Sequence, residues 1–424
     1  MNLKYRRLKG TRDLMLEELE RWHWCEERWA DVLGRYGYGE IRTPVIEPTE
    51  LFLRSVGEGT DIVDKEMYTF ETKGGESLTL RPEMTASVVR AYLENGLTRQ
   101  PGTVKFWYMA PMFRHDRPQA GRYRQFHQVG VEAIGSASPV LDAEVIQTAL
   151  ALFDAVDARG ITVLLNSIGC PACRPAYLRD LSAFLEANLE RVPEAMRSRI
   201  GTNPLRLFDA KDDGVEELLA GFRPITDAIC GACRDHHAVV RATLADLEVP
   251  FVDDPTLVRG LDYYGRTTFE FTAASGRKQS SLAGGGRYDY LVEQCGGPPT
   301  PAIGFSVGIE RTLLHLADEP VDPQLSRQAQ VDVFVAAVGD EAQRYALTGA
   351  DRLRGFCRVE VDTTGRALKA QLKSANLRRA RVLLVAGEQE RQDGTMQMKD
   401  LATGEQQTVD RTQILAAVRE VLEG

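Results

Sequence analysis

The alternation of apolar and polar residues divides the chain into helical and extended segments. Apolar residues recur at helical spacing over residues 14–36, which predicts an amphipathic helix. The segment EIRTPVIE (40–47) predicts a strand with Pro44 at an edge or a bulge, because proline cannot donate a hydrogen bond inside a sheet. Alternation of period two predicts further strands at 65–81 (a hairpin that turns at KGGE), 103–113, 126–134 and 265–272.

Helical patterns follow several of these strands. We expect a helix to begin in RPEMTASVVRAYLEN (81–95), with Pro82 in its first turn, where a missing N–H is tolerated. The stretch AGGGRYDYLVEQCGG (283–297) predicts a glycine-rich turn that leads into a helix. Further helical segments are expected at 140–156, over most of 170–236, and at SVGIERTLLHL (306–316).

The rhythm changes after ADEPVDPQLSRQAQ (317–330), a polar, proline-containing segment that predicts a linker. Beyond it strands and helices alternate, as in a small α/β domain. We therefore expect an α+β domain with an antiparallel sheet and flanking helices over residues 1–325, a mostly helical insertion in it at about 170–240, and an α/β domain over 326–424.

Composition narrows the class of protein. With 424 residues the chain is too long for one ordinary core, and 43% hydrophobic and 27% charged residues describe a globular protein. No apolar run reaches the roughly 18–20 residues that span a bilayer, and no secretory signal pattern is visible. We expect a cytoplasmic protein without a membrane partner. The net charge of −9 argues against general coating of nucleic acid but permits local basic surfaces.

A predicted hairpin in the first domain, FRHDRPQAGRYRQFHQVGVE (113–132), is rich in basic residues. Four arginines lie in or beside its polar loop: Arg114, Arg117, Arg122 and Arg124. Guanidinium groups at this density suit a polyanion such as phosphate. A solvated basic loop is the alternative.

The returning strand of this hairpin has one polar face. Alternation places Phe126, Gln128, Gly130 and Glu132 on the same side. An aromatic ring, an amide and a carboxylate make a poor core, so this face is a candidate pocket floor. His127 faces the other way and is expected to be structural.

A second candidate site lies in LVRGLDYYGRTTFEF (257–271). TTFEF alternates like a half-buried strand, but Arg259, Asp262, Tyr263 and Tyr264 precede it between glycines. A strand that served only the core would not need an arginine there. The pattern alone leaves the role of Arg259 open, and an ion pair with Asp262 is the structural alternative to a functional role.

Two of the cysteine motifs have the spacing of metal ligands: CPAC (170–173) and CGAC (230–233). Four thiolates suit a tetrahedral, structural zinc ion if the intervening chain brings the two pairs together. Buried or incidental thiols are the alternative. The candidate ligands are Cys170, Cys173, Cys230 and Cys233, with His236 and His237 as weaker substitutes.

Together these motifs resemble those of class II aminoacyl-tRNA synthetases, specifically the histidyl-tRNA synthetases. FRHDRPQAGRYRQFHQVGVE resembles motif 2, AIGFSVGIERTLL (302–314) motif 3, and the region around Pro44 with the helix before it motif 1. LVRGLDYYGRTTFEF resembles a signature of the histidyl enzymes, and RPEMT, AGGGRYD and KGTRD also fit. The resemblance runs from residue 9 to the end and implies a class II catalytic domain followed by an anticodon-binding domain.

The resemblance implies a histidine–tRNA ligase with two steps. The carboxylate of L-histidine attacks the α-phosphate of ATP, which enters with Mg²⁺, and the 3′ end of tRNA(His) then takes the histidyl group. The attacking carboxylate is ionised at pH 7, so the first step needs alignment and charge compensation rather than a general base. By resemblance, Arg259 is a catalytic cation near the α-phosphate, Arg114 holds that phosphate, and Arg311 holds the γ-phosphate end.

The family pattern also implies the binding residues. Phe126 would stack on adenine, and Arg122 would bind ATP. Motif 2 usually has a glutamate two residues after its arginine. Asp116 stands there in this chain, and its shorter side chain would reach adenine through water. The implied histidine-binding residues are Glu83, Thr85 and Gln128 at the α-amino group, Glu132 and Tyr264 at the imidazole, and Tyr263 and Tyr288 along the pocket.

Two local basic surfaces are expected to meet tRNA. In GRALKAQLKSANLRRARV (365–382), Lys369 and Lys373 share a helix face with Arg366, and no acidic residue interrupts the run. A solvated helix face is the alternative. The second surface is the motif 2 loop, where the residues implied to meet the acceptor end of tRNA(His) are Arg117, Gln119 and Arg124.

The resemblance to motif 1 also implies a homodimer.

Two non-catalytic classes of protein are the alternatives to the enzyme. One is the regulatory subunit of ATP phosphoribosyltransferase, a paralogue that usually lacks the C-terminal domain and the arginine motifs. The other is a histidine-sensing, RNA-binding module. The presence of Arg114, Arg259 and Arg311, together with about 95 residues after the linker, favours the enzyme.

Overall fold

The computed structural model describes residues 4–15, 17–57, 60, 62–209, 212–273, 280–317 and 331–424. The chain divides into two compact units, Met1–Pro320 and Val321–Gly424. The domain boundary expected at 325/326, and the expected linker except Ala317, lie outside the described residues.

The first unit is built on an eight-stranded sheet with the order β1-β5-β6-β11-β10-β9-β7-β8. Neighbouring strands are antiparallel, except for β1 with β5 and β7 with β8. The strands expected at 103–113, 126–134 and 265–272 are confirmed. The bounds are β1 (Gly39–Glu40), β5 (Val104–Phe113), β6 (Gln125–Ile134), β7 (Ile161–Ser167), β8 (Phe251–Asp253), β9 (Gly265–Ala273), β10 (Ser280–Arg287) and β11 (Ala302–Gly308).

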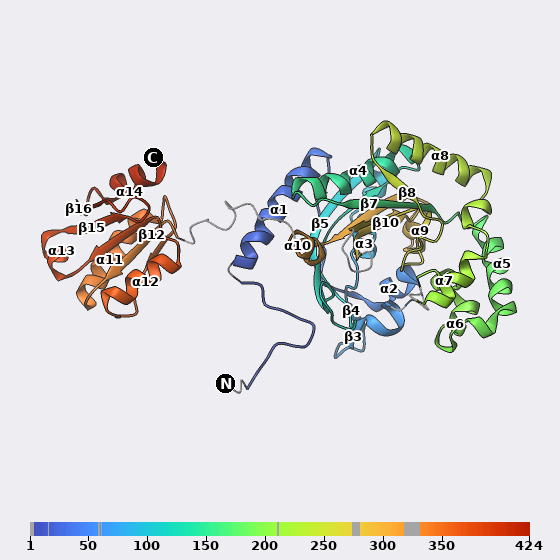
Figure 1. The fold of residues 1–424 in the computed structure, drawn as a ribbon, viewed down its shortest axis with the longest axis horizontal. Coiled ribbons are helices and arrows are strands. Elements are labelled where there is room, and N and C mark those ends of the chain that lie inside the picture. Colours follow the sequence, from blue (N-terminus) through green and yellow to red (C-terminus); the bar gives the residue numbers. More distant parts are fainter. Residues whose placement is uncertain are drawn as a thin grey trace. The chain divides into compact units, whose positions relative to one another are not determined.

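Helices cover both faces of this sheet (Figure 1). The helices α1 (Glu17–Arg35), α4 (Pro139–Ala155) and α8 (Gly231–Asp246) share one apolar cluster with Val129 and Val131 of β6. Helix α3 (Thr85–Glu94) packs in a second cluster on the other face. Side chains alternate along β6, so Phe126, Gln128 and Glu132 point away from α1 and α4. The polar face expected for this strand therefore does not enter the first core.

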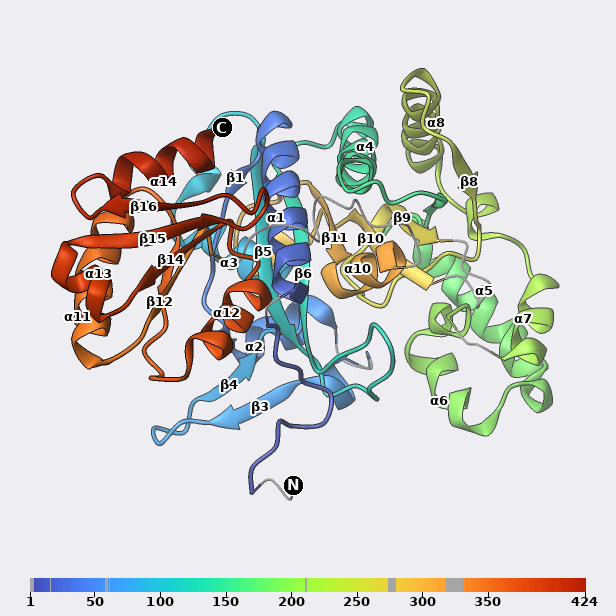
Figure 2. The same cartoon turned by 60° about the vertical axis from the view of Figure 1, so that its left-hand side comes forward.

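A small sheet with the order β2-β4-β3 stands beside α2 (Thr49–Val56) (Figure 2). Its strands are β2 (Ile46–Pro48), β3 (Tyr68–Glu71) and β4 (Ser77–Leu80), which confirms the predicted hairpin. The single strand expected over 40–47 is wrong, because β1 and β2 belong to different sheets. The segment between β1 and β2 is held by a side chain instead of a sheet. The buried guanidinium of Arg81 donates hydrogen bonds to the carbonyl oxygens of Thr43 and Pro44 at 2.9 and 3.2 Å.

The run Gly284–Gly286 does not form the expected turn. It lies inside β10, between β9 and β11, and only the short helix α9 (Leu291–Gln294) follows. Glycine is required by close approach: a Cβ on Gly285 would lie 2.2 Å from the carbonyl oxygen of Gly304, and one on Gly284 would lie 2.3 Å from the guanidinium of Arg259. These glycines therefore make room for neighbouring groups rather than for a change of chain direction.

Two other helix starts differ from those the sequence predicts. Ser306 and its neighbours belong to β11, so the helix expected from there, α10, spans Ile309–Ala317. Pro82 lies before Met84, the N-cap of α3, rather than in its first turn. The side chain of Glu83 supplies the acceptors for this helix start, as described below.

A mostly helical insertion connects β7 to β8, as expected for residues 170–236. It contains α5 (Arg174–Ala187), α6 (Glu194–Thr202), the short helix η4 (Pro204–Leu207), α7 (Asp213–Ala220) and α8. The fully buried Arg287 of β10 donates to Asp142 of α4 at 2.8 Å, and the other oxygen of Asp142 lies 2.8 Å from His236 of α8. This buried network fixes β10 to two helices.

The second unit has a five-stranded sheet with the order β13-β12-β14-β15-β16, in which β13, β12 and β14 are parallel. The predicted alternation of strands and helices is confirmed, although α13 was not foreseen. The elements are β12 (Val333–Ala337), α11 (Asp340–Leu353), β13 (Val359–Val361), α12 (Leu368–Leu377), β14 (Val382–Ala386), α13 (Glu388–Asp393), β15 (Thr395–Asp400), β16 (Gln406–Asp410) and α14 (Ile414–Glu423).

One expectation about the basic run in this unit is wrong. Helix α12 begins at Leu368, so Arg366 does not share a helix face with Lys369 and Lys373. Arg366 pairs with Asp362 at 2.8 Å instead.

No helix among the described residues of the chain is long and apolar enough to cross a membrane.

Candidate active site

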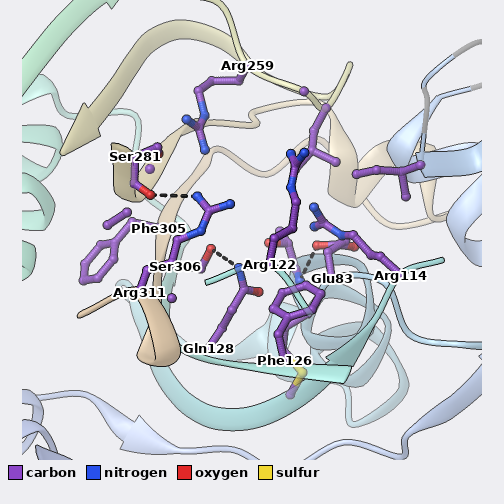
Figure 3. A pocket seen from close by; sticks show the side chains of 18 of the residues that line it. Glu83, Arg114, Arg122, Phe126, Gln128, Arg259, Ser281, Phe305, Ser306 and Arg311 are labelled. Atoms are coloured by element: carbon purple, nitrogen blue, oxygen red, sulfur yellow. Dashed lines mark hydrogen bonds between the residues drawn. The ribbon is translucent and has the colours of Figure 1, made fainter. Parts of the chain in front are cut away.

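A cavity of about 210 Å³ opens beside the polar face of β6. Its walls come from the start of α3, the loop between β5 and β6, the loop 257–264 before β9, strand β10, and α10 (Figure 3). One water occupies about 30 Å³ of liquid volume, so the cavity has room for a small molecule. Four arginines line it, Arg114 and Arg122 from the β5–β6 loop, Arg259 from the loop before β9 and Arg311 from α10.

Two of these arginines are held by backbone carbonyl groups. Arg114 follows β5, and its Nε donates to the carbonyl oxygen of Pro82 at 2.8 Å. Arg311 lies in the first turn of α10, and its Nη1 donates to the carbonyl oxygen of Ser281 at 2.7 Å. A carbonyl group orients a guanidinium without neutralising it, so both side chains keep their full charge beside the cavity.

The other two arginines are held by carboxylates. Arg122 Nε lies 2.7 Å from Asp116 Oδ2, and Arg259 pairs with Glu270 of β9. The alternative pairing of Arg259 with Asp262 is wrong, because Asp262 faces the helical insertion. Sequence reasoning missed Glu270. The only sign of it in the sequence is a charged residue in the otherwise apolar or hydroxylated TTFEF. The structure places Glu270 in register with Gly284 on β10.

The guanidinium groups of the cavity lie near one another and near carboxylates. Burial lowers the pKa of Arg114, and burial together with the neighbouring charges of Arg122 and Arg114 lowers the pKa of Arg311. Both side chains stay protonated at neutral pH because the ordinary pKa of arginine is so high. Four carboxylates also line the cavity: Glu66, Glu83, Asp116 and Glu310. Glu83 accepts from the start of α3, Glu310 accepts from the backbone of β6, and Asp116 pairs with Arg122. The guanidinium groups are the part of the cavity that can bind a ligand with several negative charges.

Carboxyl and hydroxyl groups form a second part of the site. Glu83 accepts from the backbone N–H groups of Thr85 and Ala86 at 2.7 and 3.0 Å and so caps α3. Thr85 Oγ1 donates to Glu132 Oε1 at 2.8 Å, and the hydroxyl of Tyr288 donates to Glu132 Oε2 at 2.5 Å. Burial raises the pKa of Glu132 to about 8. This part of the site therefore presents little net charge.

The structure brings most of the expected binding residues together. Gln128 Nε2 donates to Ser306 Oγ at 3.0 Å, a partner that sequence reasoning missed. Glu132 and Tyr288 do not line the cavity, because they lie behind Thr85. The remaining residues expected to bind histidine or ATP all line it: Glu83, Thr85, Gln128, Tyr263, Tyr264, Asp116 and Phe126, with the four arginines.

The residues expected to meet the acceptor end of tRNA differ in exposure. Arg117 and Gln119 are exposed at the tip of the β5–β6 loop. Arg124 is half-buried, packs against Gly10, and donates from Nε to the carbonyl oxygen of Asp116 at 3.3 Å. Arg124 therefore helps to shape the loop.

His127 lies on the opposite face of β6. Its backbone N–H donates to Glu310, and its ring meets Trp22 edge-on with 4.9 Å between the ring centroids. Both contacts agree with the expected structural role.

The four candidate metal ligands converge. The Sγ atoms of Cys170, Cys173, Cys230 and Cys233 all lie within 4.8 Å of one another, and three neighbouring pairs are 3.7, 3.9 and 4.0 Å apart. Zn–S bonds of about 2.3 Å in a tetrahedron place sulfur atoms about 3.8 Å apart, so the thiols fit zinc. The substitute ligands have other partners: His236 bonds to Asp142, and His237 lies 3.6 Å from Asp253.

In the second unit, Lys369 and Lys373 are exposed on α12. The neighbouring Arg378 and Arg381 pair with Glu360 and Asp400. Acidic residues distant in sequence thus reduce the basic run to a smaller free surface than the sequence indicated.

A large, mostly antiparallel sheet, an arginine-lined cavity beside it and a separate α/β unit after it define a class II aminoacyl-tRNA synthetase. A family model described as histidyl-tRNA synthetase matches residues 10–312, and one described as anticodon binding domain matches residues 332–421. The chain belongs to the histidyl-tRNA synthetase family.

Individual relatives agree with this assignment. The histidine–tRNA ligase of Pelotomaculum thermopropionicum is 45% identical over 419 residues, which cover 99% of this chain and 98% of the relative. The crystal structure of apo S. aureus histidyl-tRNA synthetase has a TM-score of 0.80 at 34% identity and covers 98% of this chain and 100% of that one. A Bacillus halodurans ATP phosphoribosyltransferase regulatory subunit/histidyl-tRNA synthetase shares the fold at 20% identity, with a TM-score of 0.65 and coverage of 91% and 99%.

The raised pKa of Glu132 predicts a dependence of stability on pH. Folding favours the protonated carboxyl group, so its contribution is present below the unfolded-state pKa of about 4.5 and is lost as the pH rises to about 8. We expect Glu132→Gln, which cannot ionise, to gain stability relative to the unaltered protein over this range. A shift of even one pKa unit gives about 1.4 kcal/mol. Chemical denaturation at a series of pH values measures the difference.

Glu71→Gln, on an exposed residue of β3, is the control for this experiment. If the free energies of unfolding of Glu132→Gln and the unaltered protein ran parallel with pH, the carboxyl of Glu132 would titrate normally.

Proposed function

We propose that the chain is a histidine–tRNA ligase whose cavity beside β6 binds histidine and ATP·Mg²⁺ together. The observation that carries this proposal is the convergence of four arginines and a weakly charged polar wall on one cavity. Relatives of about 45% identity along almost the whole chain carry the name histidine–tRNA ligase, which favours the enzyme over a regulatory paralogue. Pyrophosphate exchange that depends on both histidine and ATP tests it.

In the first step, an oxygen of the histidine carboxylate forms a bond to the α-phosphorus, and the bond to the β-phosphate oxygen breaks to release pyrophosphate. Arg114 and Arg259 compensate the charge at the α-phosphate, and Arg311 binds the γ-phosphate end with Arg122. A guanidinium has five N–H donors, so Arg259 can keep Glu270 while it donates to the substrate. Glu270 then orients Arg259 before the substrate arrives.

Phe126 stacks on the adenine ring in this proposal. The guanidinium carbon of Arg114 lies 5.3 Å from the centroid of the Phe126 ring, so the base would sit next to the phosphate contacts. Asp116, which already accepts from Arg122, reaches the adenine amino group through water because its side chain is short.

The carboxyl and hydroxyl groups select histidine. Glu83, Thr85 and Gln128 surround the α-amino group, and Tyr263 and Tyr264 line the pocket. Imidazole offers one donor and one acceptor, which a carboxyl group and a phenol can both read. Glu132, which accepts hydrogen bonds from Thr85 and Tyr288, contributes to recognition of the imidazole ring from behind Thr85.

In the second step, the 3′ hydroxyl of tRNA(His) attacks the adenylate. Arg117 and Gln119, exposed at the loop tip, and Arg124 behind them meet the acceptor end. Lys369 and Lys373 bind phosphates of the tRNA in the anticodon-binding domain, for which we propose residues 326–424, with residues 1–325 as the catalytic domain. Such an enzyme acts in the cytoplasm, where translation occurs.

We also infer a homodimer through the motif 1 region. The side chains of Ile46 on β2 and Phe70 on β3 are 45% and 43% exposed and share one face of the small sheet, which a second copy of the chain could cover. The molar mass in solution, measured by sedimentation equilibrium, tests the dimer, and a monomer at micromolar concentration would contradict it.

A structural zinc ion held by the four thiolates would fix the two ends of the helical insertion. Cys170 and Cys173 precede α5, and Cys230 and Cys233 lie at the start of α8, so one ion would cross-link the first and last helices of the insertion. The ion would stabilise the fold and lies outside the cavity lining.

Arg259→His tests the catalytic arginine. We expect the fold to be retained and pyrophosphate exchange to fall by a factor of about 100 or more, because a preorganised charge at the reacting phosphate is removed. Circular dichroism and initial rates are the measurements. Wild-type exchange in a folded variant would exclude this role for Arg259.

Cys170→Ser/Cys173→Ser tests the metal. Protein purified without chelator or added metal should contain about one zinc per chain, and the variant should lose it and melt at a lower temperature. Cys357→Ser, outside the cluster, is the control and should keep the ion. Elemental analysis that finds no zinc in the unaltered protein would leave the thiols as buried cysteines.

Lys369→Ala/Lys373→Ala tests the surface of α12. We expect weaker tRNA binding, and the slope of log K against log salt should decrease by about one for each phosphate that is no longer bound. Adenylation without tRNA should not change. Lys73→Ala, at the exposed turn of the β3–β4 hairpin, removes a charge elsewhere as control. An unchanged salt slope in the double variant would show that α12 does not bind tRNA phosphates.

A further inference from the structure

The helical insertion forms hydrogen bonds with the loop 257–264, which carries Arg259, Tyr263 and Tyr264 of the cavity. Arg206 of η4 donates to the carbonyl oxygen of Gly260, the residue next to Arg259. The same guanidinium lies 3.8 Å from Asp262 Oδ1, to which Asn203 Nδ2 donates at 2.8 Å. The side chain of Arg206 is only 12% exposed, so its bond to Gly260 is partly shielded from water, whereas the bond between Asn203 and Asp262 is exposed.

A second set of contacts holds the far end of the loop. Arg174, the first residue of α5, donates from Nη2 to the carbonyl oxygen of Tyr264 at 2.6 Å and to that of Gly169 at 3.3 Å. The carbonyl of Gly169 also accepts from the backbone N–H of Arg266 at 2.7 Å.

The side of the loop that faces α2 is fixed as well. The backbone N–H of Asp262 donates to the carbonyl oxygen of Val56 at 3.2 Å. Gly57 has a φ of 95°, and a Cβ there would lie 2.6 Å from Asp262 Oδ2. Asp262 therefore sits between the end of α2 and the insertion, and its carboxylate is the point where the two meet.

Apolar packing holds part of the loop on the insertion side, because Val258, Tyr263 and Tyr264 belong to the same buried cluster as Leu205. The packing is incomplete, since a cavity of about 220 Å³ is lined by residues of both the loop and the insertion. Hydrogen bonds and charges therefore add to the positioning of the loop there. Glycine at 260, beside Arg259, leaves the backbone free to move unless something outside the loop holds it.

We propose that Arg206, Asn203 and Arg174 are positioning residues for the adenylation reaction. They act through the backbone and Asp262 of the loop, and so set where Arg259, Tyr263 and Tyr264 stand. They contact no substrate themselves. The inference rests on the proposed function, because it assigns the insertion a part in the first, tRNA-independent step.

Arg206→Ala and Asn203→Ala test this assignment in the full-length protein. We expect kcat of histidine-dependent pyrophosphate exchange to fall by about 10- to 100-fold, as small misplacement of a catalytic group does. The KM for ATP should change by less than about 2-fold, because the other arginines of the cavity are untouched. Arg206→Lys, which keeps one donor for Gly260, should recover part of kcat. A purely structural role would not give this split between kcat and KM.

Arg223→Ala is the matched control. Arg223 lies in the same insertion and pairs with Asp180, and both side chains are about half exposed. It should leave kcat unchanged. Arg206→Ala/Asp262→Ala should be no slower than the slower single variant, because residues that act as one unit are not additive.

Backbone hydrogen exchange followed by mass spectrometry supplies a readout that does not depend on catalysis. Amides of residues 257–264 should exchange faster in Arg206→Ala than in Arg223→Ala. Unchanged exchange rates together with an unchanged kcat would overturn the proposal, as would a defect confined to transfer of histidine to tRNA. If the unaltered protein showed no pyrophosphate exchange, the proposed function would fail, and hydrogen exchange would still decide whether the insertion holds the loop.

Discussion

Repulsion among like charges is the constraint on which this active site depends. Four guanidinium groups surround one cavity before any anion is bound, and each must be held against the others. The fold meets this by anchoring each arginine to a different segment, with carbonyl oxygens for Arg114 and Arg311 and carboxylates for Arg122 and Arg259. Charges fixed in advance need no rearrangement when the phosphates arrive.

The polar wall solves the opposite problem. Many ionised carboxylates beside the arginines would neutralise them. An amino acid, however, has an amino group that must be recognised by hydrogen-bond acceptors. Glu83 directs its acceptors to the start of α3, and Glu132 shares a network of hydroxyl groups behind Thr85. The two parts of the cavity thus differ in charge and not only in shape.

The sequence identified the arginines because each lies in a motif with its own spacing. It could not identify Glu270, since the partner of Arg259 is set by the register of β9 with β10 and not by distance along the chain. The glycines of β10 were misread for a related reason: glycine is the same signal for a turn and for close approach of a neighbour. The prediction that Arg366 shares a helix face with Lys369 and Lys373 was wrong because α12 begins only at Leu368. Arg366 pairs instead with Asp362, which lies just before the basic run and was not considered with it.

The crowding around β10 limits how such an enzyme can diverge. Gly284 faces the guanidinium of Arg259, and Gly285 faces the backbone of β11. Any side chain at these two positions would displace the guanidinium of Arg259 or a neighbouring strand, so a lineage that evolves a new amino-acid preference has to leave this strand unchanged. Room for variation lies on the neighbouring strands β11 and β6, where the Gln128–Ser306 pair is made by side chains alone and can be exchanged without moving the sheet.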